Sequence, residues 1–351
     1  MSTTTAYRLA NPGLGFVRGL SLRLPGGVIR DLRVGTSRAQ QPLAWDNPVY
    51  RLRLAGDSAE LQFDRPDNWA HFSIEVDADG GDGLQGALLP VAETPLDELR
   101  QRLRRQRIAF LGTARNCAAA LPASIARLRG LAGFFGAAEI HVFENDSDDG
   151  TGDWLDARAA EGQLFAHREA GVAARMPRRT ERLAYARNRL LDHVLARGPW
   201  DYVCWADLDG LVGERFSDEG FLSCFQLDEV WDAVFPLSWP IYYDIWALRE
   251  PTLATGDYVW EGRHRWDAAI ADQAEIHAAV QVLAPGRVKG WLPVQSAFGG
   301  FGLYKGAIAG RGRYHGLQGE AELCEHVPYH AALLRAGARL YLNPRCLTHI
   351  A

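Results

Sequence analysis

Between residues 108 and 207 the chain alternates short apolar runs with amphipathic stretches, and this alternation restricts the fold more than any other feature. The runs IAFLGTA (108–114), EIHVFEN (139–145) and DYVCWAD (201–207) have the length of buried strands, whereas residues 181–198 show helical periodicity. Alternating strands and helices predict a mostly parallel sheet with helices on both faces. In such sheets, ligands bind beyond the carboxyl ends of the strands.

The first part of the chain follows a different pattern. YRLRLAG (50–56) and HFSIEVD (71–77) alternate apolar and polar residues, as half-buried strands do, and turn-forming segments separate them. We therefore expect a small β-rich accessory domain over residues 1–92, with a sandwich as one possible arrangement of its strands. Residues 93–107 predict a linking helix, and residues 108–351 form the expected α/β domain.

Composition narrows the class of protein further. The 351 residues carry a formal charge of −5, with 47% hydrophobic and 23% charged residues, which is typical of a soluble globular chain and argues against broad nucleic-acid binding. The five cysteines form no CxxC pair, as is usual for reduced thiols. No secretory or membrane-spanning stretch is visible. We expect a cytoplasmic protein, with peripheral attachment to the inner face of a membrane left open.

The third apolar run ends in two carboxylates, Asp207 and Asp209, one residue apart. Because side chains at i and i+2 of a strand point the same way, both can reach the crevice at the edge of the sheet. Two neighbouring negative charges are costly unless a cation compensates them, and a hard divalent cation does so while it retains positions for phosphate oxygens. Taken alone, DLDG is equally consistent with an Asp-rich turn.

Two further motifs precede this one. FENDSDDGT (143–151) follows the second apolar run, and LAYARN (183–188) lies in the long amphipathic stretch. This order resembles the nucleotide-sugar glycosyltransferases of the GT-A fold, in whose family 2 a DDGSTDGT-like stretch, an ARN-bearing helix and a DxD strand end follow one another. FPLSWPIYYDIWALR (235–249) and the CEH segment (324–326) look most like glycosyltransferase family 69, the capsule-associated mannosyltransferases of fungi. The resemblance covers residues 108–349 and excludes the N-terminal module.

The resemblance implies a GT-A, Rossmann-like domain and a set of donor and metal ligands. The expected donor-binding residues are Thr113, Ala114, Arg115, Asn145, Asp146, Arg187, Asn188 and Asp207. The expected ligands of a Mn²⁺ or Mg²⁺ ion are Asp207, Asp209 and His349. Simpler interpretations remain for some positions: Asp149–Thr151 would only begin the next helix, Arg187 and Asn188 would lie on a solvated helical face, and a lone terminal histidine would be inert.

The glycine-rich stretch SAFGGFGLYK (296–305) resembles the acceptor loop of the same enzymes. Its glycines would let the backbone approach a sugar, and Phe298, Phe301 and Tyr304 would stack on the sugar's apolar face. A tight β-bend explains the glycines equally well. The resemblance gives an acceptor-binding set of Asp244, Trp246, Gly299, Gly300 and Phe301.

A predicted helix over residues 319–337 carries Glu325 and His326 near its start. In the GT-A enzymes that this chain resembles, an acidic residue after the glycine loop faces the acceptor, and this resemblance favours Glu325 as the general base. His326 competes because an imidazole titrates near neutral pH. Adjacent helical residues diverge by about 100°, so we expect the two not to face the cleft equally.

The sequence thus predicts a metal-dependent transfer of a sugar, such as mannose or another hexose, from a nucleoside diphosphate sugar to a hydroxyl of a glycan or glycolipid. Surface polysaccharide or glycoconjugate assembly is the expected setting. A sugar nucleotidyltransferase is one alternative, although no GxGxR-like loop follows the first strand. A non-catalytic carbohydrate-binding protein is another. The motifs leave inverting and retaining stereochemistry open.

Overall fold

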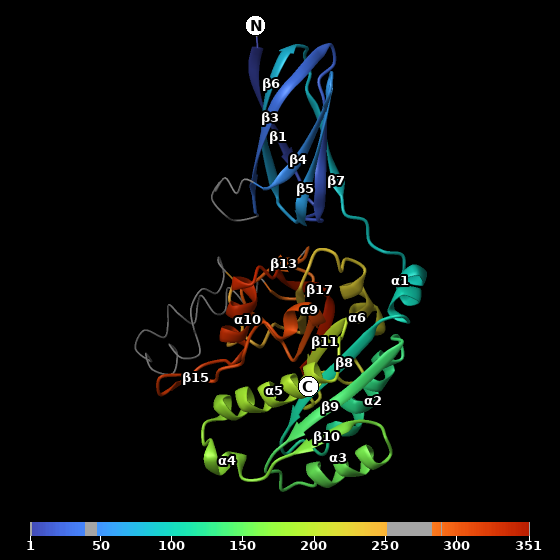
Figure 1. Cartoon of the computed structure of the whole chain (residues 1–351), viewed down its shortest axis with the longest axis vertical. Helices are drawn as coiled ribbons and strands as arrows, with labels where there is room; N and C mark the ends of the chain where they lie inside the picture. The colour runs from blue at the N-terminus through green and yellow to red at the C-terminus, as the bar shows by residue number, and fades with distance from the viewer. Residues whose placement is uncertain (1, 39–47, 251–282, 289, 351) are drawn as a thin grey trace. The chain divides into compact units, whose positions relative to one another are not determined.

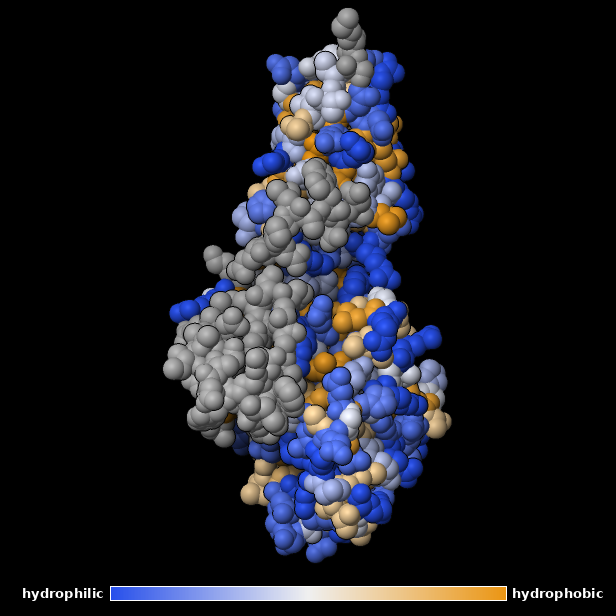
Figure 2. Space-filling model, turned by 90° about the vertical axis from the view of Figure 1, so that its left-hand side faces the viewer, coloured by the Kyte–Doolittle hydropathy of each residue, from blue (hydrophilic) through white to orange (hydrophobic). Residues whose placement is uncertain are grey.

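The computed structural model divides the chain into two compact units (Figure 1). The described residues are 2–38, 48–250, 283–288 and 290–350. One unit comprises residues 1–93 together with the short segment that contains Trp291, and the other comprises the remaining residues. Among the residues coloured in Figure 2, hydrophilic side chains predominate, and hydrophobic side chains interrupt them in small groups. Within the described residues, no helix is both long and apolar enough to cross a membrane.

The first unit contains two antiparallel sheets, with the strand orders β1-β6-β3 and β4-β5-β2-β7. The strands are β1 (Ser2–Ala10), β2 (Val17–Arg23), β3 (Gly27–Ser37), β4 (Tyr50–Ala55), β5 (Ser58–Asp67), β6 (His71–Gly80) and β7 (Gln85–Pro90). Leu20 and Leu61 from one sheet pack in the same hydrophobic core as Phe72 from the other, which makes this unit a sandwich. The expected β-rich N-terminal part is confirmed, but strands β1, β2, β3 and β7 were not predicted from the sequence.

The second unit is built on an eight-stranded sheet with the order β10-β9-β8-β11-β14-β12-β17-β13. The strands are β8 (Arg107–Ala114), β9 (Ala137–Glu144), β10 (Phe165–Arg168), β11 (Tyr202–Ala206), β12 (Ala233–Trp239), β13 (Leu292–Pro293), β14 (Phe301–Lys305) and β17 (Leu340–His349). Strands β14 and β13 run antiparallel to their neighbours, and the other adjacent pairs are parallel. The mostly parallel α/β sheet predicted from the alternating pattern is therefore confirmed.

Helices cover both faces of this sheet. They are α1 (Leu96–Leu103), α2 (Leu121–Ala132), α3 (Thr151–Ala160), α4 (Val172–Arg175), α5 (Arg179–Ala196), α6 (Asp218–Phe225), α9 (Gly306–Ala309) and α10 (His326–Arg335). Successive residues of β8 point to opposite faces. Ala109 and Leu111 join a core that contains α5 residues such as Leu190, whereas Phe110 contacts Phe221 of α6.

Two predicted helices are shorter in the structure. Helix α1 ends at Leu103 because Arg107 already enters β8. Helix α10 begins at His326 instead of residue 319, because a small hairpin precedes it. Strands β15 (Leu317–Gln318) and β16 (Ala321–Glu322) pair around Gly319, whose φ of 62° suits a tight turn.

Candidate active site

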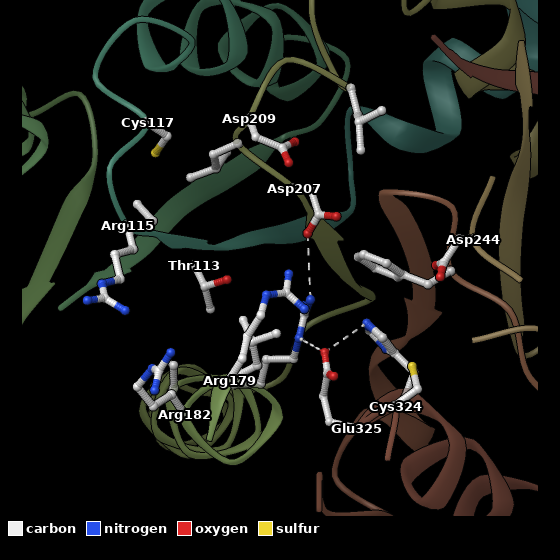
Figure 3. A pocket seen from close by; sticks show the side chains of 18 of the residues that line it. Thr113, Arg115, Cys117, Arg179, Arg182, Asp207, Asp209, Asp244, Cys324 and Glu325 are labelled. Atoms are coloured by element: carbon white, nitrogen blue, oxygen red, sulfur yellow. Dashed lines mark hydrogen bonds and ion pairs between the residues drawn. The ribbon is translucent and has the colours of Figure 1, made fainter. Parts of the chain in front are cut away.

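A cavity of 470 Å³ lies at the carboxyl ends of β8, β9 and β11 (Figure 3). These three strands are parallel, so their carboxyl ends meet at one edge of the sheet, where α/β proteins bind ligands. Many of the site residues predicted from the sequence lie together in the wall of this cavity. They are Thr113, Ala114, Arg115, Asn145, Arg187, Asp207, Asp209, Asp244, Trp246, Glu325 and His326. The fold thereby gathers segments more than 200 residues apart in the chain into one site.

The buried side chain of Arg187 connects two carboxylates of the cavity. Its Nε donates a hydrogen bond to Oε1 of Glu325 at 3.0 Å, and its Nη2 lies 3.6 Å from Oδ1 of Asp207 (Figure 3). The guanidinium carbon lies 5.0 Å from the ring centre of Trp205 and 4.9 Å from that of Phe298. Burial alone would lower the pKa of Arg187, but the two carboxylates outweigh it and raise the pKa above its ordinary value. Arg187 is therefore a fixed positive charge and does not lie on a solvated helical face.

Negative charge is in excess around Asp207. Burial raises the pKa of Asp207 to about 7; Arg187 opposes this rise, whereas the carboxylates of Asp209, Asp244 and Glu325 add to it. Among the described residues that line the cavity, these four carboxylates share one buried guanidinium. The uncompensated charge and the oxygen donors fit a hard divalent cation such as Mg²⁺ or Mn²⁺.

The opposite side of the cavity is basic. Arg115 and Arg182 lie across from Asp244, with Asp207 and Asp209 between the two sides (Figure 3). Arg179 also lines the cavity. The first turn of α5 supplies Arg179 and Arg182, and two backbone carbonyls, those of residues 176 and 177, accept hydrogen bonds from the Arg182 guanidinium.

Sequence reasoning did not assign Arg179, Arg182 or Cys117 to the site, although all three line the cavity. For the arginines a signal was present, because Arg182 lies three residues after Arg179, and Leu183 and Arg187 follow Arg179 at intervals of four, so all of them lie near one face of a helix. No comparable pattern surrounds Cys117. Burial raises the pKa of its thiol, which keeps it protonated at neutral pH.

The glycine-rich loop acts as a tight turn that holds two of the acidic residues. Gly299 and Gly300 have φ values of 66° and 82°, which other residues rarely adopt. The backbone N–H of Gly299 donates to Oδ2 of Asp244 at 2.9 Å, and the carbonyl of Gly300 accepts a hydrogen bond from the Asp207 N–H at 2.8 Å. Burial raises the pKa of Asp244, although the N–H groups of Gly299 and Ala247 partly oppose this. Neither glycine lines the cavity.

The aromatic residues of this loop separate into two environments. Phe298 lines the cavity, whereas Phe301 is fully buried and packs against Phe216 and Phe221. The expectation that Phe301 stacks on a sugar is therefore wrong. The hydroxyl of the buried Tyr304 likewise hydrogen-bonds within the core, to a histidine of α10 at 2.7 Å.

Two expected donor ligands use their side chains within the protein. The carboxylate of Asp146 accepts hydrogen bonds from the N–H groups of Gly171 and Ala173, at 2.6 and 2.7 Å. The side-chain amide of Asn188 forms two hydrogen bonds with the backbone of Tyr314, at 2.9 and 3.0 Å. Neither Asp146 nor Asn188 lines the cavity, so both shape the surrounding loops. Residues 149–151 lie at the start of α3, in agreement with the interpretation that they only begin this helix.

Glu325 and His326 both line the cavity, although adjacent helical positions were expected to face it unequally. Cys324 lines it as well, which shows that α10 presents its N-terminal end to the cavity and not one of its sides. The His326 ring stacks on Phe298 with centroids 4.0 Å apart. Its two nitrogens have no hydrogen-bond partner within the described residues, although Nε2 lies 3.5 Å from Oε1 of Glu325. Burial, together with Arg187, lowers the pKa of His326 well below its ordinary value, so the ring is neutral.

His349 lies at the end of β17 and does not line the cavity directly. Its backbone N–H approaches the carbonyl of Leu211, a cavity residue two positions after Asp209. Its Nδ1 is buried and has no hydrogen-bond partner in the described part of the chain. Burial lowers the pKa of His349, and Arg215 lowers it further. An unpartnered neutral imidazole nitrogen beside the Asp209 loop is compatible with a metal ligand.

No family model and no curated protein sequence matches the chain. The fold is distantly similar to several solved structures. The mannosyltransferase PcManGT from Pyrobaculum calidifontis, in complex with GDP-Man and Mn²⁺, is 15% identical, with a TM-score of 0.41; the match covers 70% of this chain and 57% of that enzyme. Glucosyl-3-phosphoglycerate synthase from Mycobacterium tuberculosis, in complex with Mn²⁺, UDP and phosphoglyceric acid, is 14% identical, with a TM-score of 0.38. The match covers 73% of this chain and 72% of that enzyme. GalNAc-T7 in complex with UDP, GalNAc and Mn²⁺ is 12% identical, with a TM-score of 0.43. That match covers 70% of this chain and 44% of GalNAc-T7.

Proposed function

We propose that this chain is a metal-dependent glycosyltransferase that moves a sugar from a nucleoside diphosphate to a hydroxyl group. The observation that carries the proposal is the presence, in one cavity, of Asp207 and Asp209 together with the guanidinium groups of Arg115, Arg179 and Arg182. Carboxylates alone suit a cation, and guanidinium groups alone suit a phosphate. The two sets together fit a diphosphate that carries a bound divalent cation.

The metal site in this proposal consists of Asp207 and Asp209, with His349 as a further ligand. Its fit rests on the excess negative charge around Asp207 and on the unpartnered Nδ1 of His349. The cation, Mn²⁺ or Mg²⁺, would neutralise the charge that develops on the departing diphosphate.

The donor nucleotide in this proposal lies along the ends of β8 and β9. Arg115, Arg179 and Arg182 bind the phosphate oxygens through charge-assisted hydrogen bonds. Thr113 and Asn145 present a hydroxyl and an amide, which can bond to the ribose hydroxyls or the base edge. The backbone of Ala114 contacts the same part of the donor.

The transferred sugar in this proposal lies between Asp244, Trp246 and Phe298, where a carboxylate meets two aromatic rings. Aromatic faces suit the apolar face of a hexose, for which the sequence resemblance favours mannose. The ring nitrogens of His326, which have no partner in the described residues, would bond to a sugar hydroxyl.

Glu325 is the proposed general base for an inverting reaction. Its contacts with Arg187 and His326 both use Oε1, so among the residues that the structure describes Oε2 is left to accept the proton of an acceptor hydroxyl. Beside the cavity-lining Tyr243, the side chains of Trp239 and Ile241 are also exposed. These apolar groups suit the lipid or aglycone part of a glycolipid acceptor in surface glycoconjugate assembly.

A thermal-shift screen tests this proposal. Nucleoside diphosphates and their sugars are added with Mn²⁺ or with EDTA to the wild-type protein and to Asp209→Asn. A ligand that binds the native state raises the melting temperature. We expect at least one nucleotide to raise it with Mn²⁺ in the wild type, and much less in Asp209→Asn. Equal shifts with Mn²⁺ and with EDTA would refute the metal-dependent site.

A further inference from the structure

Three histidines from three different elements meet outside the cavity. His141 lies on β9, His167 on β10 and His193 on α5, and none of them lines the cavity described above. Each offers one ring nitrogen, and these three nitrogens all lie within 4.8 Å of one another. Strands β9 and β10 are parallel neighbours, and α5 packs on β9. The packing of the sheet and the helix, and not a local motif, therefore brings the three rings together.

The spacing of two of the three nitrogens matches a tetrahedral metal centre. Nδ1 of His141 lies 3.2 Å from Nε2 of His167. In a tetrahedral zinc site with zinc–nitrogen bonds of about 2.0–2.1 Å, neighbouring ligand nitrogens are about 3.3–3.4 Å apart. The rings of His167 and His193 approach with centroids 4.4 Å apart. His193 is exposed, so solvent can reach the fourth position.

A carboxylate orients the first of these histidines. Nε2 of His141 hydrogen-bonds to Oε2 of Glu139 at 2.9 Å, and Arg197 holds Glu139 through two hydrogen bonds of 2.7 and 2.9 Å. A proton on Nε2 leaves the lone pair of Nδ1 free for a metal. Metal-binding histidines usually donate their other ring N–H to a carboxylate in this way. The His141 ring also stacks on Phe165 with centroids 4.6 Å apart, which fixes its plane.

The protonation states agree with this geometry. Burial lowers the pKa of His141 to about 4, although Glu139 opposes the shift. Burial also lowers the pKa of His167 to about 4, and the neighbouring His193 and His141 contribute, followed by Arg189 and Arg197. Both rings are therefore neutral at pH 7, the form that binds metal. The pairing of Arg197 with Glu139 reduces the repulsion that this guanidinium would exert on a cation.

We propose that His141, His167 and His193 form a zinc site, separate from the carboxylate site of the cavity. Imidazole nitrogens suit Zn²⁺, whereas a carboxylate site suits Mg²⁺ or Mn²⁺. A bound ion would tie β10, which ends the sheet, and α5 to β9. The site does not depend on the proposed glycosyltransferase activity.

Cobalt(II) titration of the metal-free protein tests the site, because tetrahedral cobalt absorbs visible light far more strongly than cobalt in an octahedral oxygen site. We expect one equivalent of strongly absorbing cobalt in the wild type, displaced by zinc. His193→Ala, at an exposed position, should lose this absorption while keeping the melting temperature of the metal-free protein. His71→Ala, an exposed histidine on β6, and Asp209→Asn should retain it.

A second variant examines the supporting carboxylate. Glu139→Gln keeps an oxygen acceptor for His141 but removes the charge, and it should weaken zinc affinity by about 10–100-fold. Equal cobalt spectra and zinc affinities in the wild type, His193→Ala and Glu139→Gln would overturn the proposal. In that case the 3.2 Å contact between His141 and His167 is a hydrogen bond between two neutral rings.

Discussion

The guanidinium of Arg187 hydrogen-bonds to the carboxylate of Glu325 across 138 residues of sequence, with both side chains at most 5% exposed. This contact joins α5, which lines the donor side of the proposed site, to the start of α10 on the acceptor side. One buried charge pair therefore couples the two halves of the cavity, and its removal should affect both stability and chemistry.

Arg187→Met should lower the free energy of unfolding by about 3–5 kcal/mol, because it leaves a buried carboxylate without its partner. Arg187→Lys should lower the free energy of unfolding by less, since it keeps the positive charge but loses the planar set of guanidinium donors. Urea unfolding measures both. In the double variant Arg187→Met/Glu325→Gln, the decrease in the free energy of unfolding should be clearly smaller than the sum of the decreases in Arg187→Met and in Glu325→Gln. Strict additivity would show that the pair does not interact in solution.

The roles of Glu325 and His326 can be separated by kinetics. For an inverting enzyme, Glu325→Gln should lower kcat by about a hundredfold or more and spare donor affinity, because glutamine keeps an oxygen acceptor for Arg187 but cannot take up the acceptor's proton. His326→Ala should reduce kcat less and should weaken sugar binding. The opposite ranking, with donor affinity unchanged in both variants, would assign the base to His326.

The pH dependence of stability should report the buried His330. Its Nδ1 and Nε2 contact the hydroxyls of Ser296 and Tyr304 at 2.9 and 2.7 Å, and burial lowers its pKa to about 3. The unfolded chain, with a histidine pKa of about 6.5, binds a proton over a range in which the native state does not. Stability contributed by the neutral ring is therefore present above pH 6.5 and is lost as the pH falls towards 3.

Denaturant unfolding of the wild type and of His330→Gln at several pH values measures this contribution. Between pH 6 and 4, the decline in the free energy of unfolding should be shallower in the variant by about 1.4 kcal/mol per pH unit. Parallel profiles in the two proteins would mean that His330 titrates normally in the native state.

Much of the second unit could be predicted from its sequence, because its elements have strong local signals. The apolar runs gave β8, β9 and β11, and strand alternation placed Asp207 and Asp209 at one edge of the sheet. The pairing of Arg187 with Glu325 could not be predicted, since it depends on how α5 and α10 pack. The burial of Phe301 was missed for a related reason: a glycine-rich motif identifies a turn but not the direction of the aromatic rings beside it.

The histidine cluster illustrates the same limit. His141, His167 and His193 are 26 residues apart in turn, so no local spacing connects them. In the first unit, the strands β1 to β3 were missed because their alternation is weaker: β3 contains two adjacent exposed residues, Arg30 and Asp31, at an irregularity in its pairing. Such bulges interrupt the period of two on which strand prediction depends.

We propose that residues 1–92 form an accessory domain for acceptor binding or assembly. A protein beginning at Thr94 should fold and bind the donor nucleotide, because the cavity residues all lie after this point. Trp291 packs with Phe16 in the first unit, so truncation would expose it, and Trp291→Ser should improve solubility. Circular dichroism measures whether the truncated protein folds, and nucleotide binding measures whether its donor site is intact. A truncated chain that is unfolded even with Trp291→Ser would show that the two parts depend on each other to fold.

The central claim is a metal-dependent transfer of the sugar from a nucleoside diphosphate, and release of the diphosphate measures it directly when water takes the place of the acceptor hydroxyl and receives the sugar. Candidate donors are incubated with Mn²⁺, and the released diphosphate is quantified for the wild type, Asp209→Asn and the matched control Asp218→Asn, an exposed aspartate on α6. The account predicts release by the wild type and the control, abolished by EDTA and reduced at least about a hundredfold in Asp209→Asn at unchanged melting temperature. Near-normal release by Asp209→Asn, or release that persists in EDTA, would contradict it.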